Sequence, residues 1–260
     1  MLSKARVLEI RKVSSNCYFL LLEEARIARE SLPGQFLHIR IGESLTPFLR
    51  RPFSIAGTSP ENGTLKILFQ VMGEGTRILS MVQKEDRLDC LGPLGSGFST
   101  QKAHNTSVLL AGGIGAAPLM FLSEALLREQ KKVIFYYGAS SLEQIIPVRS
   151  FFPSEAEVYL ATEDGSAGYR GFVTEAFQEG LNNGLKPAEI FACGPKPMLQ
   201  KLAEKNRDWK FPMQISLEER MACGIGACQG CAVTVQEKGE TRCGLVCRDG
   251  PVFNWDEVVW

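Results

Sequence analysis

The sequence predicts a mixed fold, in which an all-β half built as an antiparallel barrel precedes an α/β half built on a parallel sheet. Three observations predict it. Apolar and polar residues alternate with period two over about the first hundred residues. Apolar strands then alternate with helical stretches. Finally, three cysteines fall within nine residues near the C-terminal end. The length of 260 residues suggests one large domain or two to three small ones.

The first half contains six short strands separated by turn signals, such as LPG at 32–34 and SPENG at 59–63. Strands at this spacing are typical of an antiparallel barrel. One short helix is expected after Thr76. The six strands are expected at 5–13, 17–23, 35–41, 52–57, 64–72 and 87–91.

The second half alternates strands with helices, which is the pattern of a parallel sheet with crossover helices. Strands are expected at 107–111, 133–137, 157–161 and 189–193. Helices are expected after the first strand to residue 129, at 172–179 and at 196–204.

We therefore expect three domains: a barrel domain over 1–102, an α/β domain over 103–210 and a cysteine-rich domain over 211–260. The last is too short to fold without a bound ligand.

Composition excludes several classes of function. The 29 basic residues balance the 29 acidic ones, so nothing points to nucleic acid or an anionic membrane surface. The N-terminal residues lack the apolar core of a signal peptide, and the longest apolar stretch, 108–122, is too short to span a bilayer. We expect a soluble cytoplasmic protein, in which cysteines are more often metal ligands or core residues than disulfides.

The cysteine spacing is the most specific signal in the chain. Cys223, Cys228 and Cys231 form a C-x4-C-x2-C run, and Cys243 or Cys247 can supply a fourth ligand. This is the plant-type [2Fe–2S] pattern, and thiolates are the soft ligands that iron–sulfur clusters need. A zinc site that uses two cysteine pairs is an alternative, although it would leave Cys223 unused. Unliganded core cysteines are a weaker alternative.

Two segments of the barrel half could hold a flavin dinucleotide. The sequence RRPFSIAG at 50–57 offers a guanidinium for a pyrophosphate, a rigid proline and a serine hydroxyl facing a flat ring. Gly75 and Thr76 precede the expected short helix, where a threonine cap would favour an anion. Each segment alone is also compatible with an ordinary turn or cap.

Two strand-to-helix turns in the α/β half could bind a dinucleotide. Gly112, Gly113 and Gly115 follow a strand, and small residues there let a phosphate approach a helix N-terminus. The spacing departs from the standard G-x-G-x-x-G fingerprint, so a plain tight turn is the alternative. The second turn carries Cys193 and Gly194 at the carboxyl end of another strand, where ligands bind in open α/β sheets.

Taken together, RPFS, GGIGAAP and CGPKPM in this order resemble the ferredoxin–NADP reductase superfamily. The sequences MACGIGACQGC at 221–231 and CRDGPVF at 247–253 are more specific and resemble the electron-transfer subunits of class 1B dihydroorotate dehydrogenases. The resemblance covers essentially the whole chain. It implies a fourth cluster ligand at Cys247, the cysteine that precedes DGPVF, while the nearby Cys243 is a departure from the family pattern. It also implies an FAD site made of Arg51, Pro52, Phe53, Ser54, Leu68, Phe69, Gln70, Gly75 and Thr76.

The resemblance further implies an oxidoreductase that works by electron transfer. NADH would deliver hydride to FAD, and electrons would pass through the [2Fe–2S] cluster to FMN in a separate catalytic subunit, which oxidises dihydroorotate to orotate in pyrimidine biosynthesis. The flow could also run toward NAD. A heterotetramer with two copies of each chain is expected. No general acid or base pair stands out, and His38 and His104 are expected to be surface or core residues.

Two alternatives remain open. A related flavoprotein, such as a ferredoxin reductase, a sulfide dehydrogenase or a hydrogenase diaphorase subunit, would share the domain order and differ in its partner. A metal-stapled binding module would bind no flavin and would not react with NADH.

The sequence favours NADH over NADPH. Residues 138–147 contain Glu143 and no Lys or Arg, and TEDG at 162–165 adds Glu163 and Asp164. A ribose hydroxyl suits an acidic neighbour, whereas a 2′-phosphate usually needs a basic one. Cys193 could face the nicotinamide or serve as a packed thiol.

Overall fold

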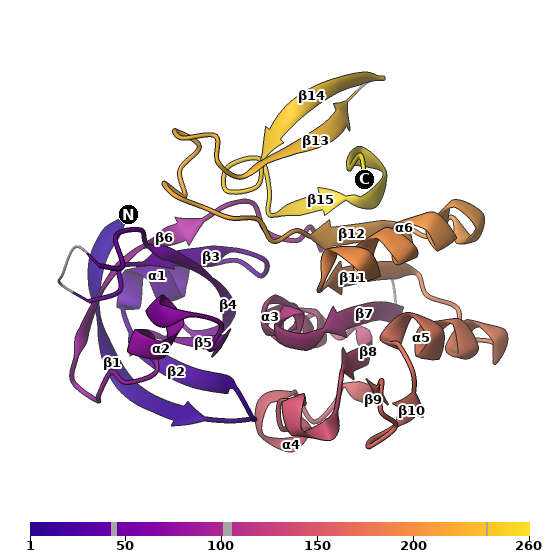
Figure 1. Cartoon of the computed structure of the whole chain (residues 1–260). Coiled ribbons are helices and arrows are strands. Elements are labelled where there is room, and N and C mark those ends of the chain that lie inside the picture. The colour runs from indigo at the N-terminus through magenta and orange to yellow at the C-terminus, as the bar shows by residue number, and fades with distance from the viewer. Residues whose placement is uncertain (43–45, 101–105, 238) are drawn as a thin grey trace.

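Six antiparallel strands close into a barrel in the N-terminal half of the computed structural model, which describes residues 1–42, 46–100, 106–237 and 239–260 (Figure 1). The closing order is β1-β2-β5-β4-β3-β6, which confirms the predicted barrel. The strands are β1 (Leu2–Lys12), β2 (Cys17–Glu23), β3 (Phe36–Ile39), β4 (Arg51–Ser59), β5 (Thr64–Gln70) and β6 (Arg87–Leu94).

Alternation along the strands fills the barrel with aliphatic side chains. Leu37 and Ile39 of β3, Ile55 of β4 and Ile67 of β5 are fully buried in one cluster. Two helices accompany the barrel, α1 (Ala25–Glu30) and α2 (Glu74–Leu79). Helix α1 was not expected from the sequence, because six residues with two buried positions are too short to show a helical period.

The second half forms a seven-stranded sheet in the order β10-β9-β8-β7-β11-β12-β15. All pairs are parallel except β12 with β15. The strands are β7 (Thr106–Gly112), β8 (Lys132–Ala139), β9 (Glu157–Thr162), β10 (Tyr169–Arg170), β11 (Glu189–Cys193), β12 (Met213–Ser216) and β15 (Val252–Asn254).

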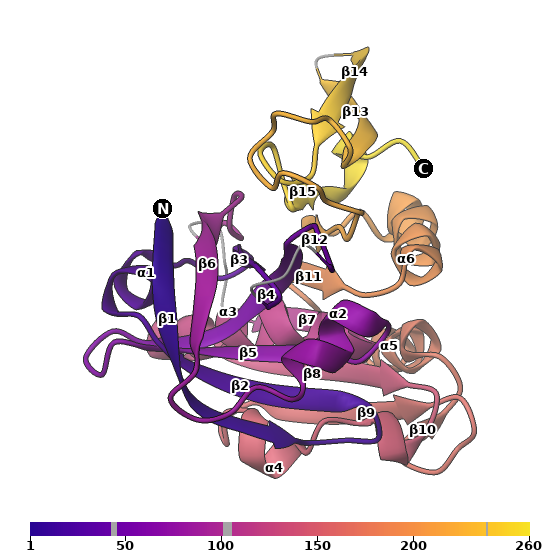
Figure 2. The same cartoon turned by 60° about the vertical axis from the view of Figure 1, so that its left-hand side comes forward.

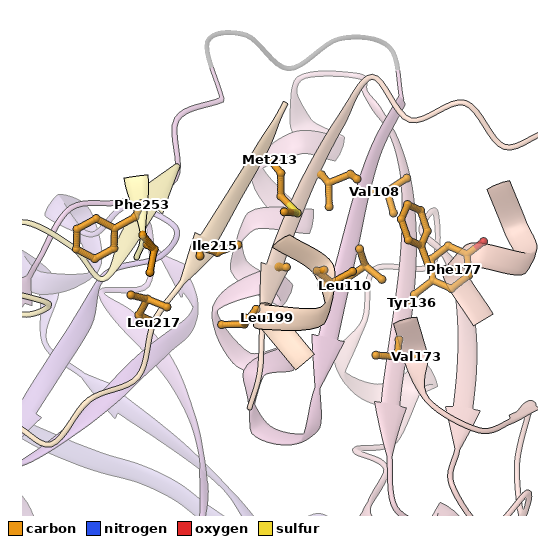
Figure 3. Close-up of a cluster of buried hydrophobic side chains, with 14 of the residues drawn as sticks. Val108, Leu110, Tyr136, Val173, Phe177, Leu199, Met213, Ile215, Leu217 and Phe253 are labelled. Carbon is orange, nitrogen blue, oxygen red and sulfur yellow. The ribbon is translucent and has the colours of Figure 1, made fainter. Parts of the chain in front are cut away.

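Helices cover this sheet and join it to the barrel. They are α3 (Ala116–Arg128), α4 (Val148–Phe151), α5 (Val173–Asn182) and α6 (Lys196–Trp209), with short 3-10 turns at Gly113–Gly115, Leu142–Gln144 and Trp255–Glu257. Helix α3 lies between the sheet and β4 of the barrel, where Leu119 and Leu122 share a buried cluster with Phe19. On the opposite side of the sheet, Val108 and Leu110 pack with Phe177 of α5 and Leu199 of α6 (Figure 3).

The C-terminal segment forms a separate hairpin of β13 (Ala232–Glu237) and β14 (Glu240–Leu245) (Figure 2). It also contributes β12 and β15 to the large sheet. Strand β12, which begins three residues after the predicted boundary at 210, pairs with β11. Its four residues are too few to show a period, which explains why the sequence did not predict this strand. The three domain ranges stay a prediction.

No helix in the described ranges is long and apolar enough to cross a bilayer.

Candidate cofactor sites

A cavity of about 330 Å³ lies between the barrel and the beginning of the C-terminal segment. Its barrel wall consists largely of residues predicted to bind a flavin: Pro52, Phe53, Ser54, Leu68, Phe69, Gln70 and Thr76. They come from β4, β5 and α2, three neighbouring elements, so the barrel brings these separate sequence segments together. We call this cavity the barrel pocket.

Arg51 and Gly75 are not among the residues that line the barrel pocket, but they adjoin each other, and their chain neighbours Pro52 and Thr76 do line it. A Cβ placed on Gly75 would lie 3.2 Å from Arg51 Nε, so the glycine leaves room for the guanidinium. Arg51 Nη1 donates hydrogen bonds to the carbonyls of Leu49, at 2.5 Å, and of Arg50, at 3.3 Å. These contacts hold the cation near the N-terminal end of α2.

Thr76 does not cap α2 as the sequence suggested. The N-cap is Gly73, and Thr76 is the third helical residue. Its Oγ1 accepts hydrogen bonds from the backbone N–H groups of Met72, at 2.9 Å, and Gly73, at 3.2 Å. The hydroxyl therefore fixes the turn that leads into the helix, while the residue still lines the barrel pocket.

The opposite wall of the barrel pocket was missed by sequence reasoning. Ile114 and Ala117 supply part of it from the turn and helix after β7. The remainder comes from the C-terminal segment: Ser216, Leu217, Glu218, Glu219, Met221 and Pro251. Burial of the carboxyl between this pocket and a neighbouring cavity raises the pKa of Glu218. Only the fold reveals the C-terminal part of this wall, because its residues follow the last barrel strand by more than 120 positions in the sequence.

A second cavity, of about 460 Å³, lies at the carboxyl edge of the parallel sheet and is called the sheet pocket below. Gly112 at the end of β7 and Gly113 just after it, two of the residues predicted to bind a dinucleotide, line it together with Ser140 after β8 and Glu163 after β9. Gln70 lines both pockets, so they are adjacent. A ligand in one pocket can therefore approach a ligand in the other.

Gly115, Cys193 and Gly194 are not among the residues that line the sheet pocket, but they belong to the two turns whose residues Gly113 and Pro195 do line it. A Cβ on Gly115 would lie only 2.4 Å from the carbonyl oxygen of Cys193, and one on Gly194 would lie 3.0 Å from the backbone nitrogen of Gly112. The two turns thus pack backbone to backbone. The Cys193 thiol is 1 % exposed, and burial raises its pKa strongly, which supports the packed-thiol alternative.

Of the acidic residues predicted near a ribose, Glu163 lines the sheet pocket, and its Oε1 accepts a hydrogen bond from Ser140 Oγ at 3.1 Å. Asp164 instead accepts hydrogen bonds from Ser166, and Glu143 is not among the residues that line the pocket. One cation also lines the pocket, Lys201, whose Nζ lies 3.1 Å from Glu175 Oε1.

We call residues 223–231 the cysteine loop. Backbone N–H groups of this loop and of Cys247 donate to each of the four sulfurs predicted to hold a cluster. Cys223 Sγ accepts from Ile225 and Cys228, at 3.5 and 3.4 Å. The hydrogen bond from Gly226 to Cys247 Sγ is 3.1 Å long. Gly230 donates to Cys228 Sγ, and Cys247 N–H donates to Cys231 Sγ, both at 3.4 Å. Such donors stabilise thiolates and tune cluster potentials.

The thiols of Cys223 and Cys247 differ in their acidity. Burial opposes ionisation of Cys223, but hydrogen bonds from the backbone of Ile225, Cys228 and Ala227 lower its pKa to about 6. Burial and the neighbouring Cys231 raise the pKa of Cys247 to about 12 in the metal-free chain. A coordinating metal deprotonates thiols outright, so both can serve as ligands.

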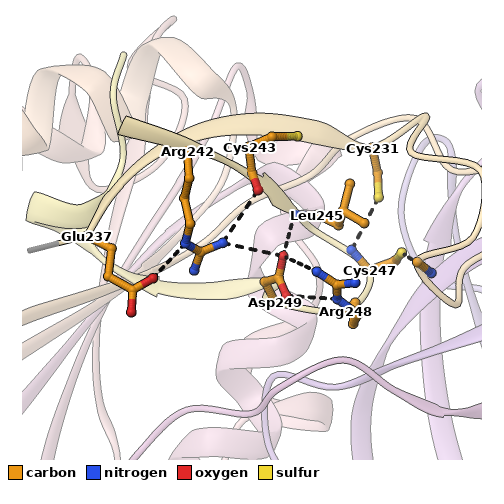
Figure 4. A network of polar contacts seen from close by, with 9 residues as sticks. Cys231, Glu237, Arg242, Cys243, Leu245, Cys247, Arg248 and Asp249 are labelled. Carbon is orange, nitrogen blue, oxygen red and sulfur yellow. Dashed lines mark hydrogen bonds and ion pairs between the residues drawn. The ribbon is translucent and has the colours of Figure 1, made fainter. Parts of the chain in front are cut away.

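Cys243 lies apart from this loop. It is exposed on β14 opposite Thr234, and Figure 4 draws no contact at its sulfur, whereas the Cys231 sulfur accepts the Cys247 N–H. The residues that hold Cys247 in place include Asp249, whose Oδ2 accepts the Leu245 N–H at 2.8 Å. The donor set therefore fits a cluster ligated through Cys247. Within the described ranges, no three potential ligands converge on a single metal ion.

Two family models match the chain. The model described as the iron-sulfur cluster binding domain of dihydroorotate dehydrogenase B matches residues 218–259, and the oxidoreductase NAD-binding domain matches residues 109–204. A curated relative from Desulforamulus reducens, named dihydroorotate dehydrogenase B (NAD(+)), electron transfer subunit, is 41% identical over 256 residues, which is 98% of this chain and 97% of the relative. The chain belongs to the dihydroorotate dehydrogenase B electron transfer family.

A second member of this family, from Geobacillus thermodenitrificans, is 39% identical and covers 97% of the chain and 96% of its own length. A solved structure described as an NADH-dependent reduced ferredoxin-NADP oxidoreductase, studied for flavin-based electron bifurcation, has a TM-score of 0.87 at 30% identity and covers 99% of this chain and 90% of its own. A ferredoxin reductase of carbazole 1,9a-dioxygenase has a TM-score of 0.72 at 22% identity, covers 83% and 68% of the two chains, and shows the shared fold.

As a member of the dihydroorotate dehydrogenase B electron transfer family, the chain is an oxidoreductase component that carries electrons. The family models confirm the predicted iron–sulfur cluster and NAD as cofactors. The flavin-based relative supports FAD as the third, since the barrel pocket has the predicted lining.

Proposed function

We propose that this chain carries electrons between NAD(H) and an FMN-containing catalytic subunit that oxidises dihydroorotate to orotate in pyrimidine biosynthesis. The proposal rests on full-length similarity to named electron transfer subunits. The order of sites suits it: Gln70 lies between the sheet pocket and the barrel pocket, and Met221 lies between the barrel pocket and the cysteine loop. Electrons would follow this order.

In the barrel pocket, the β4 and β5 residues would hold FAD and exclude water from its ring. A bound flavin supplies the step between a two-electron hydride and single electrons. Arg51 would bind the pyrophosphate, because a guanidinium forms charge-assisted, bidentate contacts with phosphate oxygens. In the sheet pocket, the backbone at Gly112 and Gly113 would receive the NAD phosphates. Cys223, Cys228, Cys231 and Cys247 would hold a [2Fe–2S] cluster.

We expect the Arg51→Ala protein to purify with little flavin and to regain colour in excess FAD. Losing a charge-assisted contact costs about 1.5–3 kcal/mol of binding free energy. Flavin absorbance after gel filtration measures this occupancy. Arg26→Ala is the matched control, because Arg26 is exposed and paired with Glu30 on α1, which contributes no residue to the barrel pocket. If Arg51→Ala kept its full flavin content after dilution, Arg51 would not be part of the FAD site.

NADH is expected to reduce the flavin faster than NADPH does, because the Glu163 carboxylate would repel a 2′-phosphate in the sheet pocket. In Glu163→Gln the preference should narrow by about fivefold, since two like charges about 4 Å apart repel by ~1 kcal/mol in water. Stopped-flow bleaching of the flavin at equal concentrations of the two nucleotides measures it. Glu143→Gln, outside the pocket lining, is the control. A wild-type protein that prefers NADPH would contradict this assignment.

The decisive test of the proposed function is reconstitution with a partner. The isolated chain should pass electrons from NADH to artificial acceptors without converting dihydroorotate, because the proposed function places dihydroorotate oxidation at the FMN of the catalytic subunit. Adding an FMN-containing dihydroorotate dehydrogenase chain should yield NAD-linked orotate formation, followed by absorbance. Dihydroorotate turnover by the isolated chain would refute a subunit role. We further propose that the complex contains two copies of each chain, which light scattering of the mixture would test. We also propose that the chain lies in the cytoplasm, which cell fractionation would test.

One observation favours a second candidate. The NADH-dependent ferredoxin-NADP oxidoreductase matches nearly the whole chain in structure at 30% identity. A chain of that type would couple to ferredoxin and not to a dihydroorotate-oxidising partner. Reduction of ferredoxin by NADH, together with failure to couple to the dihydroorotate dehydrogenase chain, would favour this candidate.

A further inference from the structure

His38 is a buried histidine with no assigned role in the proposed electron route. Its side chain is 0 % exposed on β3. Neither ring nitrogen has a hydrogen-bond partner within the described residues. The backbone groups of Cys223 and Arg50 lie within interaction range of the ring. A buried polar group without a good partner costs free energy, so an apolar side chain would fill this space more favourably.

The ring lies directly against the cysteine loop. A Cβ placed on Gly224 would be 2.5 Å from His38 Nδ1 and 3.1 Å from two ring carbons. Gly224 has a φ of +71°, which glycine adopts without strain. The loop thus approaches the ring as closely as a backbone can, at the residue next to the predicted ligand Cys223.

The same face of β3 also reaches the barrel pocket. Leu37 and Ile39 point into the barrel core, so Phe36 and His38 face the other way. Phe36 lines the barrel pocket and shares a buried cluster with Cys231 and Cys247. In the pairing of β3 with β4, Phe36 lies opposite Ser54, and His38 lies opposite Pro52. One strand pair therefore carries both the flavin-facing residues and the histidine.

On the basis of the proposed function, we propose that His38 is a positioning residue for electron transfer between the flavin and the cluster. The ring lies against Gly224, next to Cys223, and in the loaded protein its N–H would donate to the loop backbone and so hold the cysteine loop at a fixed place against the strands of the flavin site. A packing role alone would need only the shape of the ring, whereas this role needs the ring N–H as well.

The test compares variants of the full chain loaded with FAD and cluster. His38→Phe keeps a ring and removes the N–H, His38→Ala removes both without adding volume, and His38→Asn restores an N–H near the position of Nδ1. Ile39→Val is the matched control, because Ile39 is buried on the opposite face of the same strand. The readouts are flavin bleaching by NADH, the rate of cluster reduction that follows, and the EPR-monitored midpoint potential of the cluster.

We expect His38→Phe and His38→Ala to bleach at the wild-type rate but to reduce the cluster about tenfold to a hundredfold more slowly, the usual effect of losing an outer contact to a metal site. Their midpoint potential should shift, and His38→Asn should restore both readouts. If His38→Phe does not fold, His38→Ala decides. The proposal would be overturned if folded His38→Phe or His38→Ala reduced its cluster at the wild-type rate and with the wild-type midpoint potential. It would also be overturned if His38→Phe, His38→Ala and His38→Asn were equally slow in cluster reduction. A wild-type chain that fails to reduce its cluster with NADH would instead refute the proposed function.

Discussion

Cys247→Ser is expected to lose the cluster completely, whereas Cys243→Ser should retain it. Cys247 is 2 % exposed, its sulfur accepts the Gly226 N–H, and its own N–H donates to Cys231 Sγ. These contacts orient its thiol toward the loop that carries the other three predicted ligands. Cys243 is exposed on a hairpin strand and lies apart from that loop.

Iron content and the rhombic spin-half EPR signal of the reduced protein measure this difference. The two serine variants serve as controls for each other, since they make the same chemical change four residues apart. Loss of the signal in Cys243→Ser alone would move the fourth ligand to that position. Equal retention in both would mean that the two thiols can substitute for each other.

Gly115→Ala is expected to abolish most flavin reduction by NADH. The added Cβ would meet the Cys193 carbonyl oxygen at 2.4 Å, its carbon at 2.6 Å and the Gly194 nitrogen at 2.7 Å. All three are backbone atoms, so no side-chain rotation can relieve the overlap. The two turns at the sheet pocket must separate, which we expect to cost about 1–3 kcal/mol of unfolding free energy and to displace the nucleotide.

Stopped-flow bleaching and thermal unfolding measure both effects. Gly184→Ala is the matched control, because Gly184 has a φ of +92° with nothing within 4 Å of a Cβ, so it tests backbone strain without overlap. It should lower stability modestly and leave flavin reduction unchanged. A Gly115→Ala protein that bleaches at the wild-type rate would show that the contact between the turns is not needed.

Local patterns predicted the parts of the site that lie within single segments. The C-x4-C-x2-C spacing and the turn at Gly112 and Gly113 each fall within a dozen residues, and short-range pattern is what a sequence displays directly. The same holds for Pro52 and Ser54, which line the pocket from one strand.

The parts of the site that the sequence did not predict arise from contacts between segments far apart in the chain. Leu217 and Met221 form a wall of the barrel pocket only because β12 pairs with β11 and directs the chain back toward the barrel. The role of Cys193 likewise depends on its burial, which the strand pattern alone left open. His38 appeared unremarkable in the sequence because nothing near it indicates that Gly224 will pack on its ring.

The two outer strands of the large sheet are very short: β10 has 2 residues and β15 has 3. An exposed strand edge offers unpaired N–H and C=O groups that another chain can extend by strand addition, the usual beginning of edge-to-edge aggregation. By pairing with Gln214, Ile215 and Ser216, the C-terminal residues of this chain occupy such an edge. Strand addition is therefore a poor route of attachment to this sheet, for a partner and for another copy alike. Any association at these edges must rely on complementary side-chain surfaces.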